Sequence, residues 1–393
     1  MFYPDVVSTA QHLTDLATAL VERGHEVTVV SSQQAYEHPE TRFPPRERWR
    51  GVNIFRVFST RLGKGAKWRR AMDFSSFLFF CAGRLLFLPR HDVVVTLTTP
   101  PLISFIGAWR AKLWRARFVY WVMDFNPDEA IAAGWLRAGS LAAKFLERLS
   151  RFSLRRADNI VALDRFMRDR IVAKDIPPQK VTVIPPWSLD NEVRFDENGR
   201  RKFRALHGLG GKFVVMYSGN HSPVHPMDTV MKAADRLREH KDIVFAFIGG
   251  GSEFARIKKW GVDNPQVLCL PYQPLQQLSA SLSSAEAQLV VMGNAMLGLV
   301  HPCKIYNIFV VGSPVVYIGP EASHVTEALK TIGGDIPFIS VRHGEVEKLA
   351  SELLRLKEQL PKTRVQSANG AAVFGANRLV PQLVAVVENV VQA

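Results

Sequence analysis

Short runs of β-branched residues alternate with longer stretches of helical periodicity along almost the whole chain. This alternation is typical of open parallel α/β sheets. The first predicted helix is the clearest, because apolar residues recur at i, i+3, i+4 and i+7 from Leu13 and Gly24 follows as a C-terminal cap. For the first half we predict strands at 25–31, 52–58, 92–97, 118–123, 159–162 and 180–184, and helices at 11–23, 70–88, 102–113, 141–156 and 165–174.

The pattern stops and then restarts, which predicts two domains. Pro185 and Pro186 end an N-terminal domain, 1–186, and the polar stretch 187–211 without periodicity is interpreted as a linker. A second domain is predicted over 212–374, and a C-terminal helix that can return to the first domain over 375–393. Its strands are expected at 213–218, 243–248, 267–270, 287–292, 314–318 and 337–341, and its helices at 227–238, 253–260, 275–282, 303–311, 322–330 and 345–359. We therefore expect two Rossmann-like domains facing a cleft, with ligands at the carboxyl ends of the strands.

The beginning of the first domain departs from this plan. A Rossmann-like domain normally opens on a buried strand, yet only ten residues, 1–10, precede the first predicted helix. Either the strand lies before Phe2, upstream of a misassigned start, or the sheet is built without it. We favour the first interpretation.

Charge is concentrated in one segment. The 393 residues have a formal net charge of +14, and residues 41–90 carry twelve Lys and Arg against two acids. The same segment contains the most apolar run, 74–89, which is shorter than the roughly 20 residues of a membrane-spanning helix. We expect 41–90 to hold the protein on an anionic membrane surface. The alternative is a core helix with a solvated basic loop.

Three features suggest a cytoplasmic location, peripheral on the inner face of the cell membrane. The three cysteines are too few to staple a chain of this length, and their odd number argues against a secreted disulfide scaffold. No basic start followed by an apolar core is seen at the N-terminus.

The most informative stretch is 301–320. Pro302 suits the first helical position, which puts Lys304 in the first turn of a helix, beside unpaired backbone N–H groups and the positive end of the helix dipole. Such a terminus attracts phosphate. Asn307, about one turn further on, can donate to and accept from a ribose. The alternative is an ordinary surface helix with an exposed lysine.

Two glycine-bearing loops follow predicted strands of the same domain. Gly219, Asn220 and His221 follow the strand 213–218, in a setting where backbone amides approach a pyrophosphate. Gly250 and Gly251 follow the strand 243–248 and leave the backbone open to a bound group.

A third loop, after the strand 267–270, brings Tyr272 to where its ring can pack on a base. Several such loops at one edge of a sheet favour a nucleotide pocket. The alternative is that Asn220 and His225 only satisfy turn backbone.

These stretches resemble the donor-binding half of family 4 glycosyltransferases, retaining enzymes of the GT-B fold that use nucleotide-diphosphate sugars. The resemblance is carried by GNHSPVHPMDT, FAFIGGGSE, LPYQP and HPCKIYNIFVVGSPVV, and in the first half by FYPDVVSTAQHLTDLATALVERGHEVTVVSS, TTPPLISFIGAWRAK and FVYWVMDFNPD. It covers nearly the full chain and is nearest to a surface-polysaccharide branch of N-acetyl-fucosamine transferases. It implies that Lys304 contacts the donor diphosphate and that Gly219 and Asn220 line the phosphate loop.

The chain departs from the family pattern around the lysine. The family commonly carries two glutamates eight positions apart, the later one binding the donor ribose, and here these positions are Leu299 and Asn307. Neutral Asn307 is left to bond one ribose hydroxyl.

On the acceptor side, Asp124 follows the apolar strand 118–123 and should emerge at the cleft. There it can orient an acceptor hydroxyl or accept its proton; the alternative is a cap on the following turn. Ser8 and Thr9, in the loop before the first helix, and His12 on that helix are candidates for the sugar pocket, although a plain surface position is favoured for His12.

The predicted function is retaining transfer of a sugar from a UDP-linked donor to a lipid-linked or polysaccharide-precursor acceptor, without a tightly bound cofactor. No metal site is predicted, because His221 and His225 have no third ligand close in sequence and no Asp-X-Asp pair exists. The positive charge that a cation would bring to the donor diphosphate is assigned to Lys304 and the helix N-terminus instead. One alternative is a nucleotide-sugar epimerase of the same fold. A nucleic-acid-binding protein is the remote alternative, since charge favours it but no signature supports it.

Overall fold

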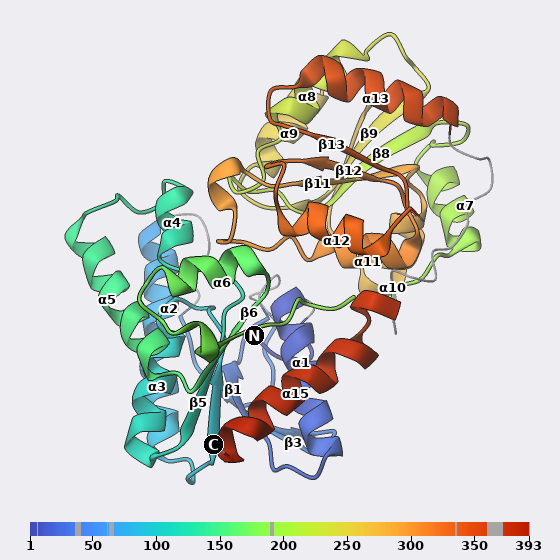
Figure 1. Cartoon of the computed structure of the whole chain (residues 1–393). Coiled ribbons are helices and arrows are strands. Elements are labelled where there is room, and N and C mark those ends of the chain that lie inside the picture. Colours follow the sequence, from blue (N-terminus) through green and yellow to red (C-terminus); the bar gives the residue numbers. More distant parts are fainter. Residues whose placement is uncertain are drawn as a thin grey trace. The chain divides into compact units, whose positions relative to one another are not determined.

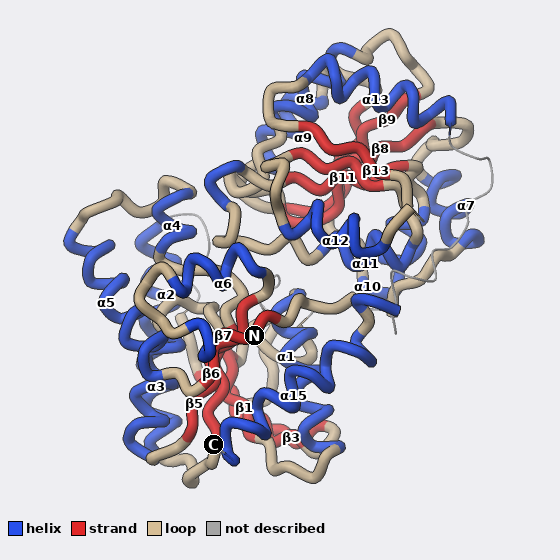
Figure 2. The backbone as a smooth tube through the Cα atoms, viewed as in Figure 1, coloured by secondary structure: helices blue, strands red, loops and turns tan. Residues whose placement is uncertain are grey.

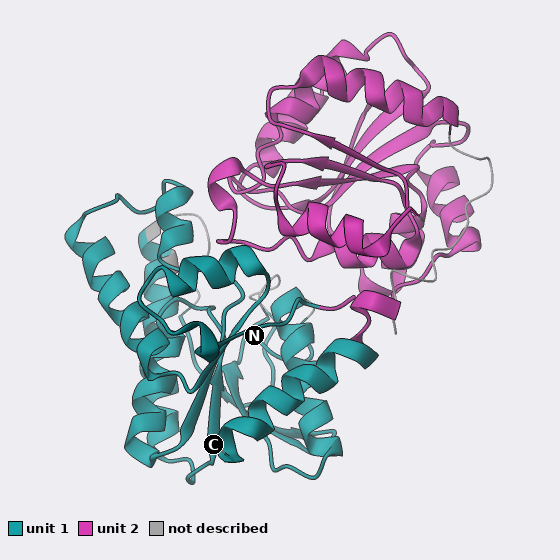
Figure 3. Cartoon of the chain, viewed as in Figure 1, with its two compact units in different colours: residues 1–186, 377–393 teal, residues 187–376 magenta. Residues whose placement is uncertain are grey.

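The computed structural model describes residues 1–5, 7–35, 41–60, 62, 67–188, 192–334, 336–359 and 372–392. The chain divides into two compact units, which Figure 3 shows in different colours. Unit 1 comprises Met1–Pro186 and Asn377–Ala393, and unit 2 comprises Trp187–Ala376. Both are α/β units with parallel sheets, as the alternating pattern predicts.

Unit 1 contains two separate sheets. The first has the order β1-β3-β2 and consists of β1 (Thr28–Ser32), β3 (Val52–Val57) and β2 (Arg46–Trp49), with β2 antiparallel to β3. The second is parallel throughout and consists of β4 (Val93–Thr96), β5 (Arg117–Trp121), β6 (Asn159–Ala162) and β7 (Val181–Val183), in chain order. The strand β2 was not predicted, since its sequence RERW is polar and its burial alternates only between half-buried and exposed.

The helices of unit 1 surround these sheets (Figure 1). They are α1 (Ser8–Glu22), α2 (Lys67–Leu86), α3 (Ile103–Trp114), α4 (Asp128–Ala132), α5 (Leu141–Arg156), α6 (Arg165–Val172), the short 3-10 helix η1 (Pro178–Lys180) and α15 (Ala376–Gln392). The C-terminal helix α15 packs on unit 1, where the carboxylate of Glu388 accepts hydrogen bonds from Arg23 at 2.8 Å and bonds the His25 ring at 2.9 Å. None of the helices in the described ranges is both long and apolar enough to cross a membrane.

Unit 2 is built on one parallel sheet of six strands, seen edge-on as red strands in Figure 2. Its order is β10 (Val267–Leu270), β9 (Ile243–Gly250), β8 (Phe213–Asn220), β11 (Ala287–Val291), β12 (Val315–Ile318) and β13 (Phe338–Val341). The central strands are almost entirely buried, as expected for apolar runs covered on both faces. The chain moves outward from β8 in one direction and from β11 in the other, so the topological switch point lies between these two strands.

Apart from α7, which was not predicted, the helices of unit 2 follow the predicted alternation with small shifts at their ends. They are α7 (Glu197–Leu206), α8 (Asp228–Arg236), α9 (Phe254–Gly261), α10 (Leu275–Ser283), α11 (Lys304–Val311), α12 (His324–Ile332) and α13 (Val346–Gln359), with the 3-10 helix η2 (Asn294–Met296) before α11.

The prediction of a linker at 187–211 is wrong. This stretch belongs to unit 2 and carries α7, which buries Phe203. Arg200 and Arg204 of α7 form ion pairs with Glu286, the latter at 2.9 Å. The helix was missed because it contains few apolar residues, and ion pairs and one aromatic side chain hold it in place.

Candidate active site

The predicted donor loops meet at the carboxyl ends of β8 and β9. These strands pair as far as Gly219 with Gly249 and Asn220 with Gly250. Gly219 has φ of +140° and Gly249 has φ of +135°, a region that other residues rarely adopt. A Cβ at Gly249 would lie 2.0 Å from the carbonyl oxygen of Gly219. Glycine is therefore required for the two loops to approach this closely.

The second glycine loop closes against the first. A Cβ at Gly251 would lie 2.3 Å from Oδ1 of Asn220, and the backbone N–H of His221 donates to the carbonyl oxygen of Gly250 at 2.7 Å. The structure thus brings together the five residues predicted in the two loops, Gly219, Asn220, His221, Gly250 and Gly251.

Lys304 opens α11, the helix that follows β11 across the switch point. Cys303 is the N-cap, so Pro302 precedes the cap instead of occupying the first helical position as predicted. The Nζ of Lys304 is buried, and it has no hydrogen-bond partner in the described part of the chain. It lies 3.3 Å from the centroid of the Tyr217 ring and 2.9 Å from where a Cβ at Gly219 would be. The alternative of an exposed surface lysine is therefore wrong.

Burial lowers the pKa of Lys304 well below its ordinary value. An amine in this state becomes charged readily when an anion arrives, because an opposite charge favours the ammonium form. The helix N-terminus adds its own partial positive charge. The start of α11 is suited to bind a phosphate group.

Two histidines, His221 buried and His225 half-buried, lie near this lysine and stay neutral. Burial, with the nearby charge of Lys304 as a second cause, lowers the pKa of His221 to about 4 and that of His225 to about 3. The Nδ1 of His225 lies 2.7 Å from the carbonyl oxygen of Val291, consistent with the alternative that this residue satisfies backbone. Both histidines are therefore neutral near pH 7, which leaves Lys304 as the side chain of the three whose charge an arriving anion would favour.

Tyr272 and Asn307 complete the predicted set in unit 2. The Tyr272 ring is 44% exposed and lies against the glycine loop, with Cε2 3.0 Å from where a Cβ at Gly250 would be. Asn307 is half-buried in α11, three residues after Lys304, and residues at this spacing share a helix face. Leu299 is 2% exposed and packs in the core.

Tyr217 was not predicted as a site residue, and Lys304 lies over its ring. Its hydroxyl donates to the carbonyl oxygen of Asn220 at 2.9 Å, which ties β8 to the phosphate-loop candidate. In the sequence it is one aromatic residue of an apolar strand, a pattern that indicates core and gives no signal of a site.

In unit 1, Asp124 lies just beyond the carboxyl end of β5. Its backbone N–H donates to Oγ1 of Thr98 at 3.1 Å, and burial raises the pKa of its carboxyl to about 6. A carboxyl group with such a pKa can accept a proton near neutral pH.

The other acceptor-side candidates differ from the predictions. Ser8 and Thr9 are not in a loop, because α1 begins at Ser8. His12 is only 2% exposed, so the favoured surface position is wrong. Its helix was predicted from apolar spacing alone, which did not include the histidine in the buried face.

The two units and these loops define a class. Two α/β units with parallel sheets, one of them carrying glycine loops and a buried lysine at its switch point, form the GT-B fold of glycosyltransferases. Residues 9–187 match the family model described as a glycosyl transferase 4-like domain. This match supports a glycosyltransferase of the family 4 type, and the solved structures below confirm the predicted fold class.

Known proteins that are similar to this chain over most of their length support the same fold and class. The chain is 25% identical over 364 residues to the putative colanic acid biosynthesis glycosyl transferase WcaI of Escherichia coli K12, covering 85% of each chain. Among solved structures, HepE from Anabaena in complex with UDP-glucose aligns with a TM-score of 0.70 and 14% identity, covering 99% of this chain and 97% of HepE. Sucrose-phosphate synthase from Thermosynechococcus elongatus aligns with a TM-score of 0.72 and 11% identity, covering 97% and 93%. The two structures share the fold with this chain.

Proposed function

We propose that this glycosyltransferase moves a sugar from a UDP-sugar to an acceptor in the synthesis of a surface polysaccharide, with retention at the anomeric carbon. The observation that carries the proposal is the buried Nζ of Lys304, next to Gly219 at the start of α11, which has no hydrogen-bond partner among the described residues. The colanic acid role in the name of the Escherichia coli relative and the UDP-glucose bound to HepE support these substrate classes.

The chemistry assigned to Lys304 is stabilisation of the leaving group. When the bond between the anomeric carbon and the phosphate oxygen breaks, negative charge grows on the nucleoside diphosphate. A buried ammonium and a helix N-terminus stabilise that charge without having to reorganise. The donor then needs no divalent cation to leave.

The remaining donor contacts follow from the positions of the loops. The backbone of Gly219, Asn220, Gly250 and Gly251 binds the diphosphate, because three of these four residues have no side chain of their own. The partly exposed ring of Tyr272 packs on the base. Asn307 and His221 supply further contacts, Asn307 to a ribose hydroxyl and His221 through its neutral ring to the donor.

Unit 1 binds the acceptor in this proposal, and Asp124 is the group that orients or deprotonates the acceptor hydroxyl. A carboxyl whose pKa is raised to about 6 is a stronger base than an exposed aspartate and is still ionised at pH 7.

A lipid-linked acceptor fits an apolar groove in unit 1. This groove of about 640 Å³ lies along α2 and is lined by Phe58, Phe79, Phe80, Phe87 and Trp109 among others. Phe79 is 74% exposed and Phe87 is 83% exposed, which is unusual for side chains of this size.

Basic side chains lie close to these aromatic residues in the sequence. Arg90 follows α2, and Lys112 lies three residues after Trp109 in α3; both are exposed. Aromatic residues at the level of the headgroups and basic residues against anionic lipid suit a peripheral position on the cytoplasmic face of the cell membrane.

A binding and product experiment tests the proposed function. Calorimetry with UDP, GDP and their sugars identifies the base, beginning with UDP-N-acetylfucosamine because of the branch that the sequence resembles. Incubation of the bound donor with lipid-linked acceptors, followed by mass spectrometry and NMR of the anomeric proton, should give a product with the donor's configuration. Isomerised donor formed without an acceptor would instead support an epimerase and contradict the proposal.

A further inference from the structure

The edge strand β2 carries two arginines on one face of the first sheet of unit 1. Side chains alternate along a strand, and Glu47 points to the other face, where it pairs with Arg56 of β3 at 2.7 Å. Arg46 and Arg48 therefore share the opposite face. Both are exposed, and the described residues include no carboxylate within ion-pair distance of either guanidinium group.

The neighbouring strands add polar side chains and one ring to this face. Arg48 lies opposite Asn53 of β3, which in turn lies opposite Thr28 of β1. Arg46 lies opposite Phe55, and its guanidinium group is 5.2 Å from the centroid of that ring. Asn53, Phe55 and Thr28 are half-buried. The face therefore presents two positive charges, an amide, a hydroxyl and an aromatic ring to the same space.

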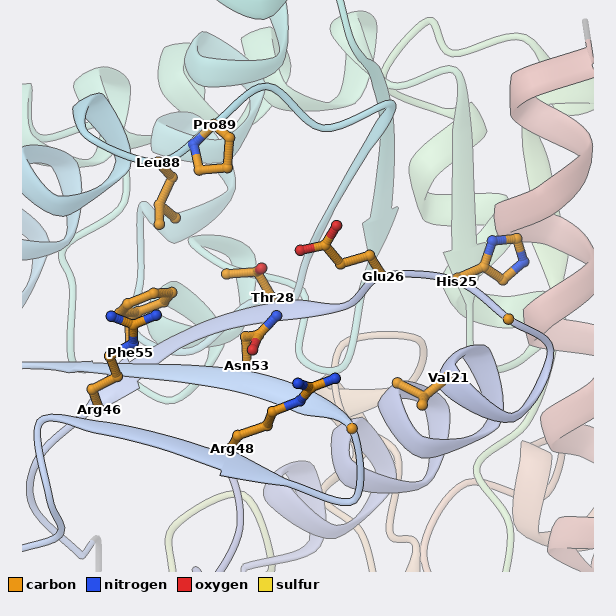
Figure 4. Close-up of a pocket in the computed structure, with 12 residues that line it drawn as sticks. Val21, His25, Glu26, Thr28, Arg46, Arg48, Asn53, Phe55, Leu88 and Pro89 are labelled. Carbon is orange, nitrogen blue, oxygen red and sulfur yellow. The ribbon is translucent and has the colours of Figure 1, made fainter.

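This face forms one wall of a cavity of about 680 Å³, which Figure 4 shows in close-up. Leu88 and Pro89, on the segment between α2 and β4, lie on one side of the cavity, and Arg46 and Arg48 lie on the other. Glu26, just before β1, also contributes to the wall. A cavity of roughly 300–1,000 Å³ has the size of a site for a small molecule or a headgroup.

The charges of the wall define the ligand that it suits. Guanidinium groups bind phosphate oxygens through paired hydrogen bonds, and two of them face this cavity. The carboxylate of Glu26 repels a second anionic group but accepts a hydrogen bond from a hydroxyl. His25 also lines the cavity, and its ring bonds Glu388 at 2.9 Å. The wall therefore favours a group with one negative charge, a phosphodiester, that also carries hydroxyls.

The cavity adjoins the apolar groove along α2. Residues 86–87 line the groove and residues 88–89 line the cavity. Arg84 lines the groove as well, and its guanidinium group lies 4.0 Å from the centroid of the Phe55 ring, which lines the cavity. The polar cavity is thus continuous with the exposed aromatic surface, so a ligand with a polar head and apolar chains matches the two together.

We propose that this cavity binds the headgroup of one anionic phospholipid, a phosphodiester with a hydroxyl-bearing group as in phosphatidylglycerol. Its phosphate lies between Arg46 and Arg48, and its hydroxyls bond Glu26 and Asn53. The inference rests on the membrane position in the proposed function and names the lipid contact that fixes it. The cavity lies at the amino ends of β1 and β3, whereas substrates of α/β sheets bind at the carboxyl ends. The lipid is therefore an anchor and not the acceptor.

Calorimetry with dihexanoyl-phosphatidylglycerol, kept below its micelle concentration, tests the proposal without a membrane surface. We expect saturable binding of one lipid per chain. The double variant Arg46→Gln/Arg48→Gln should bind about tenfold or more weakly, because hydrogen bonds from charged donors are lost. The matched control Arg42→Gln/Arg50→Gln removes the same charge at exposed positions that flank β2 and do not line the cavity. It should stay within about twofold of the wild type, because charges outside the site are screened.

Two further ligands identify what the cavity recognises. Inorganic phosphate should bind about tenfold or more weakly than the lipid, because it has no apolar chains to bury. Dihexanoyl-phosphatidylcholine, whose headgroup has no hydroxyl to donate, should also bind more weakly. Equal affinity for inorganic phosphate, equal affinity for the choline lipid, or equal loss in the two double variants would overturn the proposal. Thermal melts check that all chains are folded, and UDP binding by unit 2 reports separately on the proposed function.

Discussion

The Nζ of Lys304 lies 3.3 Å from the centroid of the Tyr217 ring, so the lysine at the start of α11 rests on an aromatic side chain of β8. The ring attracts the cation but does not replace its hydration. The two residues belong to the elements on either side of the switch point in unit 2. Their contact holds a poorly solvated amine at the end of the sheet where nucleotides bind in open α/β folds.

Lys304→Met should separate function from stability. Loss of the ammonium is expected to lower kcat/KM about 100- to 1000-fold, equivalent to about 3–4 kcal/mol, because one charged donor to the leaving group is removed. The free energy of unfolding of the empty protein should stay the same or rise, since a desolvated amine is replaced by an apolar chain of similar length. Steady-state kinetics and thermal melts check both. Lys330→Met, at an exposed site on α12, is the control and should change neither.

Gly219→Ala should destabilise unit 2 and weaken donor binding together. The residue has φ of +140°, and its new Cβ would lie 2.9 Å from the Nζ of Lys304. We expect a loss of about 1–3 kcal/mol of stability from backbone strain alone and at least a tenfold weaker affinity for UDP by calorimetry. Gly210→Ala is the matched control, because nothing lies within 4 Å of its Cβ position and its φ is not in the positive region. Equal melting temperatures for the two variants would contradict the prediction.

Asp124→Asn should change the pH dependence of both activity and stability. Burial raises the pKa of the folded carboxyl to about 6, so kcat/KM should increase as pH rises through 6, and the variant should lose this dependence and at least 100-fold in rate. Between about pH 4 and 6 the folded protein binds more protons than the unfolded chain. The free energy of unfolding therefore falls as the pH rises through this window. The variant should be more stable than the wild type above pH 6, by about 3 kcal/mol, and equally stable below pH 4.

A control at an exposed position distinguishes this effect from a general change in charge. Asp92→Asn lies in the same unit at an exposed site before β4 and should leave both profiles unchanged. A wild-type profile that is flat between pH 5 and 7 would exclude Asp124 as the base.

The regular part of the fold could be predicted because its signal is local. Strands such as Asn159–Ala162 and Val267–Leu270 have the bounds expected from their apolar runs. The helix α7 and the strand β2 were missed since polar contacts stabilise them and both contain few apolar residues. Glu286, which pairs with α7, lies some eighty residues away along the chain.

The donor site could be predicted only in outline, for a similar reason. Glycines after strands and a lysine at a helix start are local signals, and the structure brings these residues together. Tyr217, the burial of His12 and the raised pKa of Asp124 depend on what packs around each residue. These properties arise from tertiary contacts and have no sequence pattern of their own.

Removal of divalent cations should not affect donor binding. We assign neutralisation of the diphosphate's negative charge to Lys304 and the start of α11. The affinity for UDP in calorimetry should therefore agree within twofold with and without EDTA. Added Mg²⁺ should leave kcat/KM unchanged within the same factor. A requirement for Mg²⁺ that persists in the Lys304→Met variant would show that a cation performs the role assigned to the lysine.

Membrane binding should depend on the exposed aromatic residues of the α2 groove. Phe79→Ser and Phe87→Ser together remove two side chains that are 74% and 83% exposed, and little folding stability should be lost because neither is buried. In flotation with vesicles containing anionic lipid, we expect the double variant to lose at least tenfold in partitioning, because burial of a large apolar side chain contributes about 1.5–3 kcal/mol. Val262→Ser, at an equally exposed apolar site in unit 2, is the control and should float like the wild type.

Vesicles of neutral lipid should bind the wild type more weakly, since basic residues near the groove contribute about 1 kcal/mol each against an anionic surface. Equal flotation of the wild type and the double variant would exclude the groove as the docking site.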